Sequence, residues 1–326
     1  MHKTFMPLDH YVSQVHLRQF ISPDERGLMN AIRKADMKTF LTKPKDVCRI
    51  EDGSTNSYLS ESRAIETFLT GVEPKYNAAL KNVSENKLDA ETVQVLSGFV
   101  SYVAACSPAG MRINTEPLRR QVEQTTRILE AAGRFPEAPA SLGGKSLTDL
   151  IEQGIVRVNV DGKFPQAIGI SMINRFVAVF GNSHWETLDN PFAECPFFTS
   201  DYPVAIEVVP DRQDQNRIVP LSPSLAVRIC PRPTRDRSSG GLDFSRFTHC
   251  RKTLSRSEVV NLNRLIVRCA ETTVFFRDNH DWIESFVRKN AGFRIETKSL
   301  EIPSGQGLGL FFYSEVTDKW ERDSSG

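Results

Sequence analysis

The stretch that organises the chain is Asp9-His10-Tyr11-Val12-Ser13-Gln14-Val15-His16-Leu17-Arg18-Gln19-Phe20. It sets His10, Gln14 and Arg18 four residues apart, so a helix over residues 8–20 would project all three from nearly the same side. Pro23 follows, and proline disfavours helical geometry in the residue before it. The sequence therefore predicts an N-terminal helix with one polar face.

Length and composition indicate a globular chain. Its 326 residues are 40% hydrophobic and 25% charged, so they can bury one large core or two smaller ones. The net charge of +1 provides no overall attraction to nucleic acid or membranes. The six cysteines form no CxxC pair, and no stretch approaches the about 20 apolar residues of a membrane span. The opening residues lack the apolar run of a signal peptide. We therefore expect a cytoplasmic protein with no membrane partner, and the sequence indicates no oligomeric state.

The first half of the chain is predicted to be mainly helical. Apolar residues recur near helical spacing over residues 60–80, 89–105, 116–132, 146–153 and 166–181. Pro117 suits the first turn of the third of these segments. A weakly alternating strand pair, residues 28–33 and 38–41, comes before them.

After about residue 183 the sequence pattern changes from helical spacing to short strand-like runs. Prolines separate short strand-like runs at residues 204–209, 225–230, 272–276, 293–297 and 308–313. One helix returns over residues 255–269. The predicted fold class is α+β in a single unit: a helical part, about residues 1–182, packs on a mostly antiparallel sheet from about residues 183–326, and the first helix lies at their seam.

Several short elements resemble those of one mainly bacterial family. HYVSQVHLRQF, from His10 to Phe20, resembles its HYVPQxxLRxF signature, with Ser13 in place of the usual proline. Residues 198–204 are similar to its (I/L)TSDxPV element, 220–223 to its PLSP element and 263–270 to its NxxxxxxA block. The family is domain-of-unknown-function family 4238, and the resemblance covers about residues 8–280. It implies that Glu66, Glu73 and Arg112 fall where the family carries glutamates and an arginine, and it implies no activity.

The polar face of the predicted first helix is the first candidate site. The His10 imidazole could act as a general acid or base, and the Arg18 guanidinium could bind a phosphate or carboxylate beside Gln14. The structural alternative is that Arg18 pairs with Glu66 or Glu73 in a buried network. The sequence leaves both open.

The triplet Thr199-Ser200-Asp201 is the second candidate. Asp201 could accept a hydrogen bond from His10, orient a water or hold a metal, and Ser200 could act as a nucleophile or a hydrogen-bond donor. The structural alternative is an Asx turn ended by Pro203. No GxSxG motif accompanies Ser200, so hydrolase-type acyl transfer has little support.

A basic run from Arg228 to Arg256 is the third candidate. Arginines and lysines outnumber acidic residues there, and Phe244 and Phe247 are interleaved with them. Such a segment can follow a nucleic-acid backbone, with Arg232, Arg235 and Arg237 as the expected contacts. A solvated surface loop is the more common explanation of such composition.

Two functions of different class follow. The first is a hydrolase that cleaves phosphodiester bonds of nucleic acid, of toxin or defence-effector type. In it the catalytic residues are His10, Asp201 and Glu73, and the substrate-binding residues are Gln14, Arg18, Arg112, Ser200 and Asn263. The second is a non-catalytic module that binds nucleic acid or protein and whose polar residues form a structural network.

The sequence also gives expectations about metals and cofactors. His184, His249 and His280 have no partner at metal-ligand spacing, so the sequence predicts no metal site, and it identifies no cofactor. The catalytic function depends on the expectation that the first helix, the glutamate-bearing helix and the Thr-Ser-Asp corner meet at one place.

Overall fold

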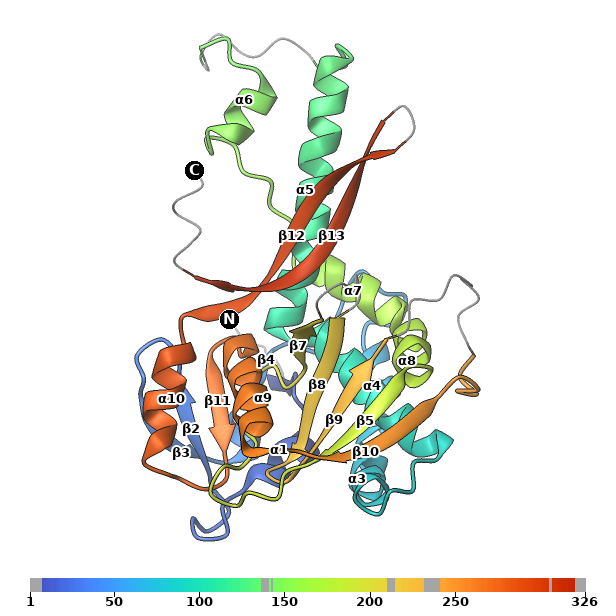
Figure 1. The fold of residues 1–326 in the computed structure, drawn as a ribbon. Coiled ribbons are helices and arrows are strands. Elements are labelled where there is room, and N and C mark those ends of the chain that lie inside the picture. The colour runs from blue at the N-terminus through green and yellow to red at the C-terminus, as the bar shows by residue number, and fades with distance from the viewer. Residues whose placement is uncertain are drawn as a thin grey trace, which may run out of the picture.

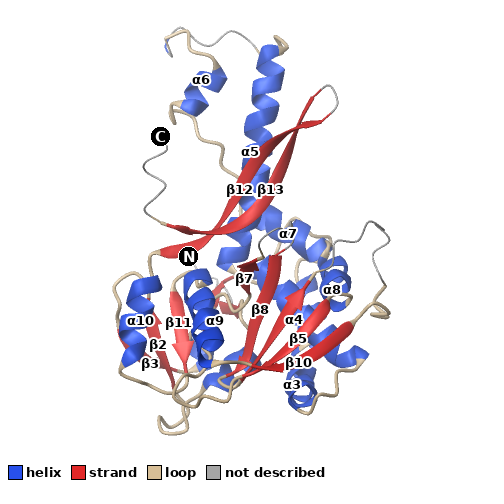
Figure 2. Ribbon diagram, viewed as in Figure 1, coloured by secondary structure: helices blue, strands red, loops and turns tan. Residues whose placement is uncertain are grey.

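The fold is α+β. The computed structural model describes residues 8–135, 141, 143–209, 215–231, 241–304 and 307–319. Within these ranges helices predominate in the first half, and sheets with mostly antiparallel pairs predominate in the second (Figure 1, Figure 2). The predicted fold class is therefore confirmed.

The helices surround α4. Those of the first half are α1 (Gln14–Leu17), α2 (Ala64–Thr70), α3 (Tyr76–Ser84), α4 (Ala90–Cys106), α5 (Pro108–Ala131), α6 (Leu147–Glu152), α7 (Lys163–Ser171) and α8 (Ile173–Gly181). Helix α4 is buried on nearly every side and packs against α3, α5, α7 and α8. Gly169 of α7 permits this packing, since a Cβ there would meet the Ala105 Cβ at 2.9 Å. Two helices of the second half are α9 (Arg256–Cys269) and α10 (Trp282–Asn290).

The largest sheet has the strand order β10-β5-β9-β8-β7. Its strands are β5 (His184–Asp189), β7 (Ala205–Val208), β8 (Gln215–Ser222), β9 (Leu225–Cys230) and β10 (Thr248–Thr253). All neighbours in it pair antiparallel except the edge strand β10, which runs parallel to β5.

A second sheet joins the two halves of the chain. Its order is β3-β2-β11-β6. Its strands are β2 (Met29–Arg33), β3 (Thr39–Thr42), β6 (Thr199–Ser200) and β11 (Thr273–Phe276). Two further pairs are β1 (Leu8–His10) with β4 (Arg49–Glu51), and the long hairpin of β12 (Phe293–Ser304) with β13 (Gly307–Asp318), which lies along α5 (Figure 1).

Helix α1 lies at the seam between the halves. The fully buried His16 bonds through Nδ1 to the Tyr76 hydroxyl of α3 at 2.8 Å and through Nε2 to the Thr199 hydroxyl of β6 at 2.8 Å. Its ring also stacks on Phe99 of α4. One histidine thus ties three elements of the core together.

The predicted helix over residues 8–20 is wrong in its first part. Residues 8–10 form β1, which pairs with β4, and the Tyr11 amide donates to the Cys48 carbonyl at 2.8 Å. The helix begins only at Gln14, and residues 18–20 form a 3₁₀ turn. His10 therefore does not share a helix with Gln14 and Arg18, because cross-strand bonds hold its backbone extended.

Other boundaries also differ from the prediction. Residues 60–80 divide into α2 and α3 around a 3₁₀ turn that contains Pro74, and residues 166–181 divide into α7 and α8 at Met172. Helix α5 starts at Pro108, capped by Ser107, so Pro117 is in its interior instead of its first turn. The strand pair at 28–41 and the helices at 89–105, 146–153 and 255–269 are confirmed. The prediction did not include β5, β8, β10 or α10.

The length and hydrophobicity of the helices bear on whether one of them could span a membrane. Over the described ranges, no individual helix is both long and apolar enough for a span; α4 and α5 meet the criterion only when taken together, with a bend of 62° between them.

Candidate functional site

A polar pocket opens beside the first helix. It has a volume of about 280 Å³ and draws on β1, α1, α2 and the 3₁₀ turn after α2. Its lining consists of Leu8, Asp9, His10, Ser13, Gln14, Val15, Arg18, Glu66, Leu69 and Glu73. This volume is near the lower end of small-molecule sites, about 300–1,000 Å³, so the pocket suits one small polar group.

His10 lines this pocket, and one of its ring nitrogens carries no hydrogen in the neutral form. The Tyr102 hydroxyl of α4 donates to the His10 carbonyl, which fixes the backbone of β1. Nε2 lies 3.3 Å from the Lys45 carbonyl, and a carbonyl only accepts, so Nε2 carries the hydrogen and Nδ1 keeps the lone pair. Burial lowers the pKa of His10, and the positive charge of Arg49 lowers it further, against the opposite effects of Lys45 and Glu73. The imidazole is therefore neutral at neutral pH and suited to accept a proton.

Arg18 and Gln14 form the cationic side of the pocket. Arg18 Nη2 donates to Gln14 Oε1 at 3.1 Å, across one helical turn. This contact aligns the guanidinium of the exposed Arg18, and among the described residues the structure records no further partner for its other hydrogens. Such a planar set of donors matches a phosphate or carboxylate.

The three carboxylates of the lining have different partners. Asp9 and Glu66 share Arg63, at 3.4 Å and 3.6 Å, and Asp9 also accepts from the Ser54 amide. Glu73 accepts a short hydrogen bond from the Ser13 hydroxyl. Because Arg63 offsets part of the charge of Asp9 and Glu66, the remaining charges of the pocket are chiefly the Arg18 cation and the Glu73 anion.

Asp201 does not line this pocket. It is 3% exposed, and its carboxylate accepts from the amides of Glu271, Thr272 and Thr273 and from the Thr272 hydroxyl. Burial raises the pKa of Asp201, and the hydrogen bonds to Thr272 act in the opposite direction. These four bonds fix the turn between α9 and β11. The role of Asp201 is structural, but it is not the expected Asx turn, because its partners lie 70–72 residues further along the chain.

Ser200 and Asn263 are also engaged in the core. The Ser200 hydroxyl accepts from the Tyr202 amide at 3.1 Å, in a local turn. Asn263 accepts from the Phe198 amide and donates to the Pro196 carbonyl. Both side chains are fully buried, so neither contributes to the pocket.

Arg112 holds α5 to the C-terminal hairpin. It makes a bidentate ion pair with Glu271, a second ion pair with Glu296, and a hydrogen bond to the Ile295 carbonyl. The structure therefore brings together His10, Gln14, Arg18 and Glu73 and places Arg112, Asp201, Ser200 and Asn263 elsewhere.

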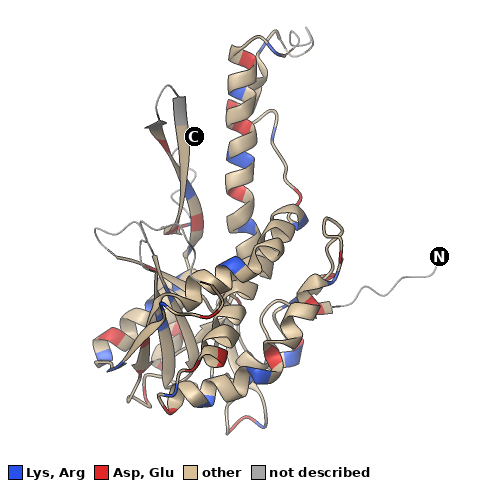
Figure 3. Ribbon diagram, turned by 90° about the vertical axis from the view of Figure 1, so that its right-hand side faces the viewer, with Lys and Arg blue, Asp and Glu red and all other residues tan. Residues whose placement is uncertain are grey.

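The basic run is only partly described. Arg232, Arg235 and Arg237 lie outside the described residues. Of the neighbouring arginines, Arg228 pairs with Glu186 and Glu207, and Arg251 pairs with Asp189. On α5, too, basic and acidic residues alternate (Figure 3). At these places positive charge is paired with negative charge.

Comparison with known proteins identifies a family. The family model described as "Protein of unknown function (DUF4238)" matches residues 9–280. The chain belongs to the DUF4238 family. No curated protein and no solved structure matches it. The DUF4238 match includes every pocket residue except Leu8 and ends before the β12–β13 hairpin.

Sequence reasoning missed several residues around the pocket of this DUF4238 protein. Ser13 and Asp9 line it, Arg63 pairs with two of its carboxylates, and Arg49 lies opposite His10 in the β1–β4 pair. Ser13 and Asp9 stand in the opening stretch, but the sequence analysis selected only His10, Gln14 and Arg18 from it. No sequence signal singled out Arg49 or Arg63.

Sequence spacing gave no indication that the fold brings His184 close to two other possible metal ligands. The Nε2 of His184 lies 3.6 Å from the Cys250 Sγ, and Glu186 completes a group whose ligand atoms are within 4.8 Å of one another. Parallel pairing of β10 with β5 brings these residues together, and the sequence prediction included neither strand.

Proposed function

We propose that the protein cleaves phosphodiester bonds and that the His10 pocket is its active site. The observation that carries the proposal is the convergence of a neutral imidazole and an available guanidinium in one open polar pocket. General bases work best with a pKa near the working pH, and a guanidinium suits a phosphate in charge and shape.

RNA is the substrate that this pocket fits best, because RNA carries its own nucleophile. His10 Nδ1 takes the proton of the ribose 2′-hydroxyl as that oxygen attacks phosphorus, and Arg18 binds the phosphate as its charge grows. The bond to the 5′ oxygen breaks, and that oxygen takes a proton from water at the pocket mouth. The products are a 2′,3′-cyclic phosphate and a 5′-hydroxyl. Glu73 stabilises the imidazolium that forms, since its negative charge raises the pKa of His10.

The experiment uses fluorescent RNA and DNA oligonucleotides of one sequence, single- and double-stranded, with a chelator or with added Mg²⁺ or Mn²⁺. We expect cleavage of RNA in the chelator, with cyclic phosphate ends. His10→Gln should slow it by about 10²–10⁴-fold, and Arg18→Met should weaken it. His249→Gln and Arg33→Met change the same residue types outside the pocket and should behave as wild type.

The proposal fails if the folded wild type cleaves none of these substrates. It also fails if His10→Gln cleaves RNA at the wild-type rate. Cleavage of DNA alone, and only with added metal, would contradict the RNA mechanism.

A second candidate is a non-catalytic binding module for nucleic acid or protein. It is favoured by the structural engagement of Asp201, Ser200, Asn263 and Arg112, half of the eight catalytic and substrate-binding residues expected from the sequence. In that case His10→Gln should lower the melting temperature while RNA binding, measured by fluorescence anisotropy, stays unchanged. Unchanged melting together with lost cleavage would reject this candidate.

A further inference from the structure

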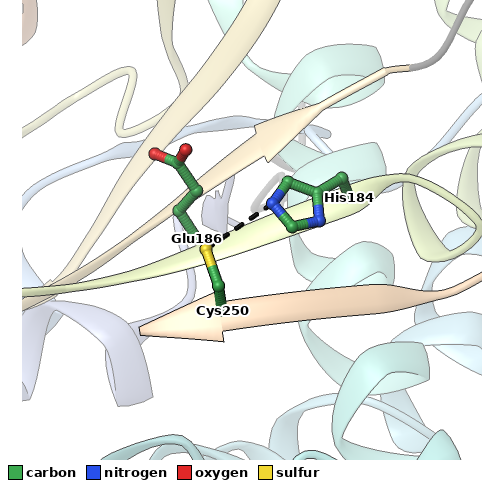
Figure 4. A group of neighbouring side chains, drawn as sticks. All are labelled: His184, Glu186 and Cys250. Carbon is green, nitrogen blue, oxygen red and sulfur yellow. Dashed lines mark hydrogen bonds between the residues drawn. The ribbon is translucent and has the colours of Figure 1, made fainter. Parts of the chain in front are cut away.

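We propose that His184, Glu186 and Cys250 form a binding site for a divalent transition-metal ion, with zinc as the best fit. The site lies on the five-stranded sheet, far along the chain from the His10 pocket. His184 and Glu186 extend from β5 and Cys250 from the edge strand β10, all toward the same side (Figure 4). Cys250 stands opposite Glu186 in the parallel pair, and His184 is two residues before Glu186, so the strand period places all three on one face.

The distances suit tetrahedral coordination. The three ligand atoms lie within 4.8 Å of one another, and His184 Nε2 is 3.6 Å from Cys250 Sγ. With bonds of about 2.3 Å to sulfur and about 2.0–2.1 Å to nitrogen, tetrahedral zinc holds two such atoms about 3.5 Å apart. Little movement of the imidazole and thiol would therefore be needed to admit the ion.

The His184 ring is already oriented for this role. Its Nδ1 lies 2.9 Å from the Thr248 hydroxyl on β10. When Nδ1 donates its hydrogen to this hydroxyl, the lone pair of Nε2 faces Cys250. Metal-binding histidines commonly have such a partner on the second nitrogen, which fixes the tautomer and the ring plane.

The charges around the cluster also balance a divalent ion. The Cys250 thiol would release its proton and bind as thiolate, so thiolate and the Glu186 carboxylate together offset two positive charges. Arg228 pairs with Glu186 but has a second carboxylate partner in Glu207, which offsets its charge. Cys250 is exposed, so the ion can enter from solvent, and three protein ligands leave a fourth position for water.

The test measures metal binding by untagged, chelator-treated protein. Cobalt(II) is the spectroscopic probe, because a thiolate ligand adds a charge-transfer band that a carboxylate or imidazole site lacks. We expect one cobalt per chain with this band, and its loss on addition of zinc. Cys250→Ser should remove the band, and His184→Asn and Glu186→Gln should weaken affinity by at least about tenfold.

Two matched variants control for indirect effects. Glu207→Gln removes the other carboxylate partner of Arg228, and His249→Asn changes the histidine next to Cys250, whose ring stacks on Phe247. Both should keep wild-type affinity, and circular dichroism should show all variants folded. The proposal is overturned if folded wild type binds neither cobalt nor zinc stoichiometrically, or if Cys250→Ser retains the charge-transfer band.

Discussion

Two histidines six positions apart have opposite environments. His10 stands at the wall of an open polar pocket, whereas His16 is fully buried between the Tyr76 and Thr199 hydroxyls. Both occur in the opening stretch, where the sequence singled out only His10 as a candidate site residue. His10 does line the pocket, although the helix predicted to carry it begins only at Gln14.

His16 should make stability depend on pH below neutrality. Burial lowers its pKa to about 3, against an unfolded value of about 6.5. Between these values the unfolded chain binds a proton that the folded chain does not, so the free energy of unfolding falls as pH falls. Relative to His16→Gln, wild type should lose up to about 1.4 kcal/mol per pH unit in urea unfolding from pH 6.5 downward. A difference that stays constant with pH contradicts this role.

Lys34 should have the corresponding effect above neutrality. Its buried ammonium donates to the carbonyls of Val267, Ala270 and Phe293, and burial lowers its pKa to about 8. Between about pH 8 and about 10.4 the unfolded chain holds a proton that the folded chain has released, so stability from this group rises with pH. Urea unfolding at pH 7.5 and 9.5 should show wild type gaining on Lys34→Met. A loss over this range would contradict the assignment.

At the scale of elements, the interior proline of α5 has a compensating contact. Pro117 has no amide hydrogen to bond with the Ile113 carbonyl one turn earlier. The Thr297 hydroxyl of β12 donates to that carbonyl instead, at 2.8 Å. The proline thus frees a backbone acceptor that helps to attach the hairpin to the helix.

A double-mutant cycle tests this contact. Thr297→Val should lower the free energy of unfolding by about 1 kcal/mol, because the Ile113 carbonyl loses its donor. In a Pro117→Ala background a helix amide is restored, so the same change should cost clearly less. Chemical denaturation of the four proteins gives the coupling. Equal costs in both backgrounds would show that Pro117 and Thr297 act independently.

Whether a segment forms a helix or a strand could be predicted better than the residues at which it begins and ends. The apolar pattern predicted α4 within one residue at each end, since local signals determine it, and the structure adds a cap in which the Asp89 side chain accepts from the Thr92 amide. Strand β1 could not be predicted, because its partner β4 follows 38 residues later and short strands depend on such pairing. The same holds for β10, whose exposed residues show no apolar alternation.

In the whole molecule, half of the predicted catalytic and substrate-binding residues lie together. His10, Gln14, Arg18 and Glu73 meet at one pocket, and all four are within the first 73 residues. Asp201, Ser200 and Asn263 instead hydrogen-bond within the core of the second half. Residue type alone could not separate the pocket residues from the core residues, because a carboxylate that fixes a turn and one that serves catalysis look alike in sequence.

We infer that the His10 pocket serves the proposed cleavage, whereas the Asp201 corner serves stability. The direct test measures the melting temperature and RNA cleavage per folded molecule for His10→Gln and Asp201→Asn. His10→Gln should melt close to wild type and lose cleavage. Asp201→Asn should lose about 3 kcal/mol of stability, because one of the two acceptor oxygens becomes an NH2 group that faces buried donors, and should keep cleavage while folded. If His10→Gln is destabilised as much as Asp201→Asn, or if Asp201→Asn abolishes cleavage at a wild-type melting temperature, the claim is contradicted.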